Sequence, residues 1–272
     1  MTIKTIREQS LGKLTLRLLE ANGVFSGIIL GGPKGRIGPI SGDTHDAVWR
    51  RLHEEAGKAD RSYFGFDGAR ARFLRFYPQG FADPGYAADE RDYKLAAKHK
   101  LDTTVPLAEA ATGAGFGEAI LAVFRATNLL SPFEKTRLQG VLRGKSADAF
   151  VRAAAHFTQG AGTPALLDME RLLRPHANAK WTVVTYLPFL WRPDAHMFLK
   201  PEVTQDFATR VGHRFRFDYE AQLDIAVYDS LLDLARQTEG VLAELGPRDR
   251  IDVQSFIWVV GAYDEVAAPP AA

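Results

Sequence analysis

The last apolar segment of the chain begins with polar side chains that could do chemistry. Asp252, Gln254 and Ser255 precede the apolar run 256–260. A carboxylate in the first turn of such a helix can be an N-cap that accepts backbone N–H bonds. It can also be a catalytic carboxylate at the lip of a cleft, where desolvation tunes its pKa. In that case an ionised Asp252 stabilises a developing cation, and Gln254 and Ser255 bind a polar edge of the substrate.

A second candidate site lies in the segment 180–201, KWTVVTYLPFLWRPDAHMFLKP. Its aromatic and cationic side chains predict one wall of a pocket, with a titratable histidine above it. Asp194 is the second candidate catalytic carboxylate. The predicted substrate-binding residues of this segment are Trp181, Trp191, Arg192, His196 and Lys200. The alternative is that both tryptophans are core residues and that the arginine forms a surface ion pair with Asp194.

A third group of charges lies in ERDYKLAAKHKLD, which starts at Glu90. Glu90 and Lys94 are four residues apart and therefore predict an ion pair on one face of a helix. A helix with this charge pattern is usually solvated. The other interpretation makes Asp92 the third candidate catalytic carboxylate, or Lys94 a catalytic residue.

Arginines and aromatic residues alternate in the first third of the chain. The formal net charge is only +1, so an anionic partner has to be bound by a local patch. We predict that this patch binds nucleic acid, with two cations in a glycine-rich surface loop and three arginines on one face of a strand at 69–77. The residues concerned are Lys34, Arg36, Arg70, Arg72 and Arg75.

Several kinds of cofactor site have no counterpart in the sequence. The chain has no cysteine, which excludes thiolate metal sites, Fe–S clusters and a cysteine nucleophile. It also lacks a P-loop, a GxGxxG fingerprint, HExxH and GxSxG. None of the seven histidines has an i,i+4 partner histidine. We expect neither a metal nor an organic cofactor, and a metal site assembled by folding from distant residues is a minor alternative.

The pattern of elements predicts an α+β fold with a small β-rich N-terminal part and a mainly helical body. Two apolar runs, 13–19 and 24–30, flank Asn22-Gly23 and indicate a β-hairpin. Asp43 or Thr44 can cap a helix that ends near Gly57. After Pro84 apolar residues recur at helical spacing. The expected helices span 87–100, 116–129, 132–142, 147–157, 164–173, 179–190, 201–211, 221–245 and 251–260.

The expected domain organisation follows from this change of pattern. A β-rich part spans 1–84, a helical domain spans 85–265, and the tail 266–272 is disordered. The N-terminus lacks the apolar core of a signal peptide, and the most apolar stretch, 181–191, is too short to span a bilayer. We therefore expect a cytoplasmic protein that does not enter the membrane.

Three segments carry a resemblance to a known family: YFGFDGARARFLRFYPQGF from Tyr63, ERDYKLAAKHKLD from Glu90 and RIDVQSFIWVVG from Arg250. They resemble a bacterial family of cytoplasmic proteins from restriction and phage-defence neighbourhoods, and the anti-phage defence DNA glycosylases. The chain lacks the LPGxGxxTA helix-hairpin-helix and the GQDPY-type loop of other glycosylases, so no catalytic residue is carried over from those families.

The resemblance implies that the protein acts on DNA and removes modified bases by hydrolysis of the N-glycosidic bond. One buried carboxylate that stabilises an oxocarbenium-like state and positions water can support this reaction without a metal. The competing hypothesis is a noncatalytic nucleic-acid-binding or adaptor protein of a restriction or defence complex. Metal-dependent hydrolysis is a third, minor hypothesis.

Overall fold

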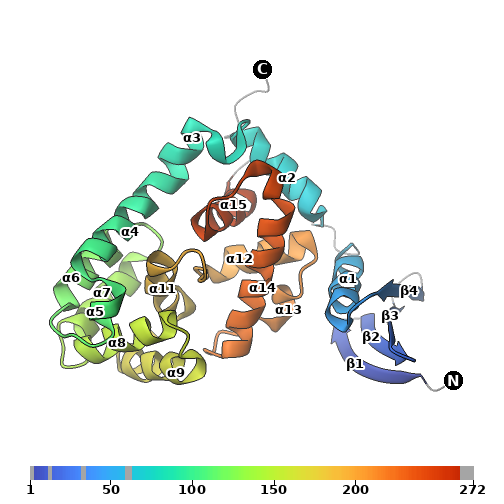
Figure 1. Ribbon diagram of the computed structural model, residues 1–272, viewed down its shortest axis with the longest axis horizontal. Helices are drawn as coiled ribbons and strands as arrows, with labels where there is room; N and C mark the ends of the chain where they lie inside the picture. Colours follow the sequence, from blue (N-terminus) through green and yellow to red (C-terminus); the bar gives the residue numbers. More distant parts are fainter. Residues whose placement is uncertain (1–2, 12–13, 32–34, 59–62, 264–272) are drawn as a thin grey trace. The chain divides into compact units, whose positions relative to one another are not determined.

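The computed structural model describes residues 3–11, 14–31, 35–58 and 63–263 (Figure 1). It is an α+β protein in which an N-terminal four-stranded antiparallel sheet precedes a mainly helical body. The predicted fold class is confirmed. The disordered tail predicted for 266–272 lies outside the described residues.

The strands are β1 (Lys4–Leu11), β2 (Leu14–Ala21), β3 (Val24–Gly31) and β4 (Arg36–Gly42). The helices of the first third are α1 (His45–Gly57), α2 (Gly65–Phe76), α3 (Pro84–Tyr86), the π-helix η2 (Ala87–Arg91) and α4 (Asp92–Thr104). The middle of the chain forms α5 (Leu107–Ala110), α6 (Gly117–Arg125), α7 (Pro132–Leu142), α8 (Ala147–Thr158) and α9 (Gly162–Leu173). The last third forms α10 (Trp181–Val184), α11 (Tyr186–Trp191), α12 (Pro201–Val211), α13 (Phe215–Asp218), α14 (Ile225–Val241) and α15 (Arg250–Ala262). Short 3-10 turns are η1 (Gly80–Ala82), η3 (Arg174–His176) and η4 (Ala243–Leu245).

The chain forms two compact units. The sheet unit comprises Met1–Arg70 and Gln205–Asp218, and the helical unit comprises Ala71–Thr204 and Tyr219–Ala272. The predicted boundary near residue 84 lies inside the helical unit. A segment from the last third of the chain thus completes the N-terminal unit, an arrangement that local sequence patterns do not encode.

The sheet unit is built on the predicted hairpin. Asn22 and Gly23 both have positive φ, 54° and 77°, as a type I′ turn requires, and β2 pairs with β3 on either side of them. The sheet follows chain order, β1-β2-β3-β4, and the outer strands β1 and β4 were not predicted. Helix α1 lies against the sheet, and the core between them contains Leu16, Leu18, Ile29, Val48, Trp49, Leu52 and Ala56 (Figure 1).

The predicted helix after Asp43 is confirmed as α1. The hydroxyl of Thr44 accepts a hydrogen bond from the backbone N–H of Ala47 at 3.2 Å, which satisfies one of the free N–H groups of the first turn. Ser131 likewise caps α7 in a capping box, in which the Glu134 carboxylate accepts from the backbone N–H of Ser131 at 2.8 Å. The cap at Thr44 was predicted from the sequence, and the start of α7 agrees with the expected span 132–142.

The strand predicted at 69–77 is wrong, because this segment is the second half of α2 and the residue after it. Ala69, Phe73 and Tyr77 are buried, at 0%, 0% and 4% exposure, and their spacing of four residues is helical. The three arginines therefore do not share one face. In a helix, Arg70 and Arg72, two residues apart, point in nearly opposite directions, whereas Arg72 and Arg75, three apart, lie on the same side.

The helices of the helical unit agree with the predicted spans to within a few residues, with two exceptions. The helix expected at 179–190 is divided at Thr185 into α10 and α11, and that expected at 87–100 begins with the π-helix η2. The short helices α3, α5 and α13 were not predicted, because three or four residues are too few for a periodic signal.

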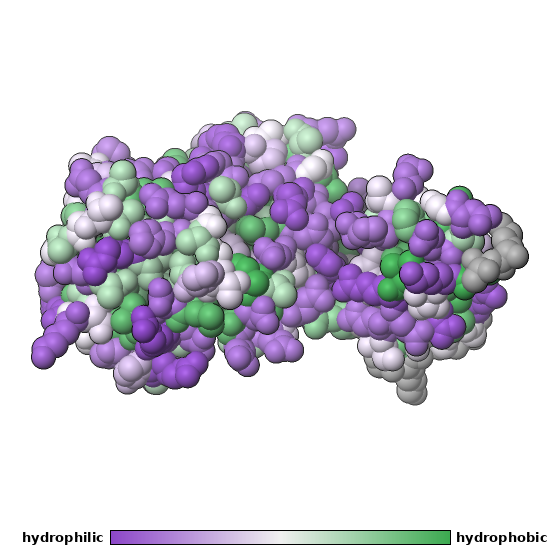
Figure 2. All heavy atoms as spheres, turned by 60° about the horizontal axis from the view of Figure 1, so that its bottom comes forward, coloured by the Kyte–Doolittle hydropathy of each residue, from purple (hydrophilic) through white to green (hydrophobic). Residues whose placement is uncertain are grey.

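The described residues contain no helix that is both long and apolar enough to cross a membrane. On the face shown in Figure 2, hydrophilic side chains predominate and hydrophobic ones form groups between them. The most exposed large hydrophobic side chain of the described residues is that of Phe133, at 78%.

Candidate active site

One pocket of the helical unit combines aromatic, amide and charged side chains. The space between its walls is about 400 Å³, a figure that includes open solvent at its mouth. Its walls come from η2, α4 and α15, from the connection between α6 and α7, and from the segment before α12. The lining residues are Asp89, Glu90, Tyr93, Asn128, Leu129, Phe198, Lys200, Gln254 and Trp258.

The lining residues suit a planar ligand with hydrogen-bonding edges. Gln254 is only 4% exposed, and its Oε1 has no hydrogen-bond partner among the described residues. A buried acceptor of this kind costs about 1–3 kcal/mol, which a donor on a ligand would recover. Tyr93, Phe198 and Trp258 offer aromatic surface on which a ring can stack. The Lys200 ammonium donates to the carbonyl of Leu129 at 3.1 Å and is thereby held at the pocket wall.

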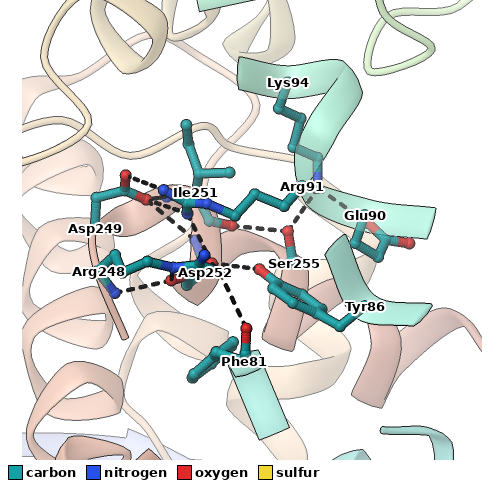
Figure 3. A network of polar contacts seen from close by, with 10 residues as sticks. All are labelled: Phe81, Tyr86, Glu90, Arg91, Lys94, Arg248, Asp249, Ile251, Asp252 and Ser255. Atoms are coloured by element: carbon teal, nitrogen blue, oxygen red, sulfur yellow. Dashed lines mark hydrogen bonds and ion pairs between the residues drawn. The ribbon is translucent and has the colours of Figure 1, made fainter. Parts of the chain in front are cut away.

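One face of helix α15 lines the pocket, and another face of the same helix packs against the rest of the helical unit. Gln254 and Trp258 are four residues apart, so they lie on the pocket face. Asp252 and Ser255 are three apart and lie on the face toward α3, η2 and α4, where Figure 3 shows them pointing at Tyr86, Arg91 and Lys94. The geometry of one helix therefore links the pocket to a polar network.

Asp252 is the centre of this network. Its side chain is fully buried and accepts five hydrogen bonds. One oxygen, Oδ1, accepts from the Tyr86 hydroxyl at 2.5 Å, from Arg91 at 2.7 Å and from Arg248 at 3.1 Å. The other accepts from the backbone N–H and Nε of Arg248, at 2.8 and 3.0 Å. Asp252 is therefore held by protein donors on both oxygens.

The position expected for Asp252 is wrong on both interpretations. It does not cap α15, because the cap is Asp249, whose carboxylate accepts from the backbone N–H of Ile251 at 2.9 Å. It does not lie at the lip of a cleft, because none of its surface is exposed. Asp249 also forms a two-pronged ion pair with Arg91, at 2.9 and 2.8 Å. We therefore place the candidate carboxylates elsewhere, at Asp89 and Glu90.

A second ion pair of the network reaches the pocket. The ammonium of Lys94, a residue with no exposed surface, lies 3.0 Å from Glu90 Oε2 and donates to the hydroxyl of Ser255 at 2.8 Å. The Tyr263 hydroxyl donates to the other oxygen of Glu90 at 2.7 Å. Both carboxylate oxygens of Glu90 are therefore held by protein donors, and the residue also lines the pocket. The solvated helix face expected for this pair is wrong.

Burial and hydrogen bonding act against each other on the ionisable groups of the network. Burial alone would raise the pKa of Asp252, but hydrogen bonds from Arg248 and Tyr86 hold it below its ordinary value. For Lys94 burial prevails over the attraction of Glu90 and lowers the pKa to about 8. Asp252 is therefore a stable carboxylate, and Lys94 is an ammonium at neutral pH that loses its proton in mild alkali.

The tryptophans and the histidine of the segment 180–201 lie in the core. Trp181 donates to the carbonyl of Glu220 at 2.8 Å, and Trp191 donates to that of Val105 at 3.0 Å. The His196 ring lies between the Tyr228 hydroxyl and the carbonyl of Thr158, at 2.9 and 3.0 Å, and burial lowers its pKa. None of the three lines the pocket; of this segment's predicted substrate-binding residues, only Lys200 does.

The remaining candidate carboxylates are exposed. Arg192 and Asp194 form a surface ion pair at 2.7 Å, and Asp194 lines a separate surface depression together with Arg248 and Asp249. Asp92 is the exposed first residue of α4. Ser255 is fully buried and donates to the carbonyl of Ile251 at 2.8 Å. The predicted site residues therefore do not converge on one pocket.

The predicted nucleic-acid-binding residues that the structure describes come from β4 and α2. Arg36 is exposed on β4, Arg70 is half-buried on α2, and Lys34 lies outside the described residues. Arg72 donates to the carbonyls of Val260 and Tyr263 at the C-terminal end of α15. Cations stabilise such an end. Arg75 is exposed.

Sequence reasoning missed seven pocket residues: Asp89, Glu90, Tyr93, Asn128, Leu129, Phe198 and Trp258. The spacing of Gln254 and Trp258 was a usable signal, because both lie on one face of the predicted last helix. Asn128 and Phe198 lie in connections between helices, where no periodic pattern applies. Only the tertiary structure brings these connections to α15.

The described residues contain no group of three or more His, Asp or Glu side chains that could hold a metal ion. Comparisons with protein-family models, with curated proteins and with solved structures gave no match. The chemistry of the pocket is therefore the main basis of the functional argument.

We predict that Asp252→Asn strongly destabilises the protein. The substitution leaves Arg91 and Arg248 facing a neutral amide, and breaking a buried ion pair costs about 3–5 kcal/mol. For a unit of this size the melting temperature should fall by roughly 10 °C. Asp194→Asn, which removes an exposed carboxylate, is the matched control and should not change it. An unchanged melting temperature for Asp252→Asn would contradict the role assigned to the network.

We predict a pH dependence of stability that is due to Lys94. Its folded-state pKa of about 8 lies below the ordinary value of 10.5, so between these values the unfolded chain binds more protons. The free energy of unfolding should therefore rise with pH in this window, by up to about 1.4 kcal/mol per pH unit. Urea unfolding from pH 8 to 10 should show this slope relative to Lys94→Met. Parallel curves for the two proteins would refute the assignment.

Proposed function

We propose that this protein is a DNA glycosylase and that the pocket between η2 and α15 receives the excised base. The observation that carries the proposal is the composition of the pocket. It joins aromatic walls and an unpartnered, buried carboxamide to two carboxylates. A base flipped out of a duplex needs a stacking surface and hydrogen-bonding groups at its edge.

The carboxamides and aromatic rings give the pocket its base-binding chemistry. Gln254 and Asn128 each present an acceptor and donors, as required for the edge of a nucleobase. Stacking of a base on an aromatic side chain contributes about 1–3 kcal/mol, which offsets part of the cost of unstacking the duplex. The affinity for an extruded base would come from these two features together.

The carboxylates give the pocket its catalytic chemistry. The bond between C1′ of the sugar and the base nitrogen breaks, the electron pair leaves with the base, and the sugar becomes an oxocarbenium ion. Glu90, held by Lys94 and Tyr263, stabilises this cation electrostatically. Water then adds to C1′ and gives its proton to Asp89, the exposed carboxylate of the pocket.

The resemblance of three segments to anti-phage defence glycosylases supports the same proposal. It adds a biological role, the removal of modified bases from phage DNA by a cytoplasmic enzyme. The charge distribution is compatible with a DNA substrate, because the sheet unit carries fourteen Lys and Arg against ten Asp and Glu, while the helical unit carries twenty against twenty-three. The formal charges are +4 and −3.

We predict that Asp89→Asn lowers the rate of base release by about 100-fold or more, because the water loses its proton acceptor. The assay incubates the protein with phage DNA that contains modified bases and with unmodified DNA, and then applies alkali, which breaks strands at abasic sites. Asp89 is exposed, so the melting temperature should stay unchanged. Asp194→Asn, an exposed carboxylate outside this pocket, is the control and should retain full activity.

The same assay separates the competing hypotheses. Strands that remain intact although the wild-type protein binds the DNA would favour the noncatalytic binding or adaptor protein. Base release that is lost in EDTA and restored by a divalent metal would favour metal-dependent hydrolysis. Equal rates for Asp89→Asn and the wild-type protein would remove Asp89 from the mechanism.

A further inference from the structure

Two tyrosines connect the two carboxylates of the pocket through their hydroxyl groups. The Tyr77 hydroxyl donates to Asp89 Oδ2 at 3.3 Å and lies 3.1 Å from the Tyr263 hydroxyl. The Tyr263 hydroxyl donates to Glu90 Oε1 at 2.7 Å. Both carboxylates line the pocket, whereas the two tyrosines do not. A chain of three hydrogen-bonding contacts therefore leads from one pocket carboxylate to the other.

Ring packing holds both hydroxyl groups in position. Tyr77 directly follows α2 and is only 4% exposed. Its ring contacts those of Phe73 and Tyr86, at centroid distances of 5.5 and 5.6 Å. Tyr263 directly follows α15 and is half-buried, and its ring lies edge to face with that of Phe76 at 5.2 Å. Aromatic contacts on each tyrosine therefore restrict its hydroxyl to a place in the chain.

This chain has fewer hydrogens than contacts. Each hydroxyl carries one hydrogen and an ionised carboxylate carries none, so two hydrogens serve three contacts when Asp89 and Glu90 are both ionised. A single proton on either carboxylate supplies the missing hydrogen. Burial raises the pKa of Tyr77 to about 12 and also raises the pKa of Tyr263, so both hydroxyls keep their hydrogen at neutral pH. The chain can therefore hold one extra proton at either end.

We propose that Tyr77 and Tyr263 relay a proton from Asp89 to Glu90 during base excision. The proton that Asp89 takes from water passes to the Tyr77 oxygen, Tyr77 passes its own hydrogen to Tyr263, and Tyr263 passes its hydrogen to Glu90. Each tyrosine gains one hydrogen and loses one, and Asp89 is ionised again. The departing base carries the electron pair of the broken bond and takes the proton from Glu90, which returns to its ionised form.

The inference rests on the proposed function, because the glycosylase reaction supplies the proton and the base that accepts it. Hydrolysis releases a proton where water attacks the sugar and consumes one on the departing base. A fixed chain of hydroxyls moves the proton between these places without charging either tyrosine. Tyr77 and Tyr263 act through the two carboxylates, so they are positioning residues and not catalytic ones.

Removal of either hydroxyl should interrupt the relay. We expect Tyr77→Phe and Tyr263→Phe each to lower the single-turnover rate of base release at least about tenfold, with unchanged affinity for the duplex. The double variant should be no slower than the slower single variant, because one gap already breaks the chain. Tyr63→Phe, in the sheet unit, is the matched control and should keep the wild-type rate. Wild-type rates in folded single variants, or losses that multiply in the double variant, would overturn the inference.

Rescue by an external proton carrier distinguishes a relay from a contact that only supports the structure. Imidazole reaches the exposed Asp89 and can carry its proton through solvent. It should restore part of the rate of Tyr77→Phe in proportion to its concentration and leave the wild-type rate unchanged. A missing hydrogen bond that served only the structure would not be replaced in this way. The absence of rescue would therefore overturn the relay.

A measurement without catalysis separates this inference from the proposed function. In the protein without DNA, the hydroxyl proton resonance of Tyr263 should shift in Tyr77→Phe, because the two hydroxyls share a hydrogen bond. An unshifted resonance would overturn the relay whatever the activity. A shifted resonance, together with a wild-type protein that binds the duplex but releases no base, would instead locate the failure in the glycosylase proposal.

Discussion

The buried ion pairs of Asp252 are the interaction on which the helical unit depends. Removing the Asp252 carboxylate and the Arg91 guanidinium from water costs several kcal/mol, and only a complete set of hydrogen bonds recovers it. The structure supplies that set through Arg91, Arg248 and Tyr86. These contacts join α15 to α3 and η2, segments about 160 residues away in sequence. The network therefore fixes the position of α15, and with it one wall of the pocket.

The position of α15 also decides which of its side chains line the pocket. Because α15 turns Asp252 and Ser255 toward η2 and α4, it turns Gln254 and Trp258 toward the pocket. Glu90 belongs to both regions, since it pairs with Lys94 on the buried side and also lines the pocket. A carboxylate held in this way stays in one position, which is the condition for electrostatic stabilisation of a cation. In the proposed mechanism, the contacts that hold Glu90 in place also position it to stabilise the cation.

Local signals in the sequence were sufficient for most of the elements. Asn22-Gly23 specifies a hairpin because both residues tolerate positive φ, and Ser131 with Glu134 specifies a helix start because each satisfies the other's backbone. The segment 69–77 was predicted to be a strand because its arginines alternate with other residues. It is helical, and its buried residues are four positions apart. The outer strands β1 and β4 were not predicted because their residues show no clear alternation of apolar and polar side chains. They form through pairing with β2 and β3.

The sequence by itself determined the fold class, the absence of cysteine chemistry and the start of several helices, because these depend on composition or on neighbouring residues. Only the tertiary structure decided which charged residues are buried. Glu90 and Lys94 have the spacing of a surface pair, yet they are buried because α15 covers them with Ser255. Asp252 was selected for its place in an apolar helix, but the same helix buries it completely. Burial depends on contacts between distant segments, and a local pattern contains no information about them.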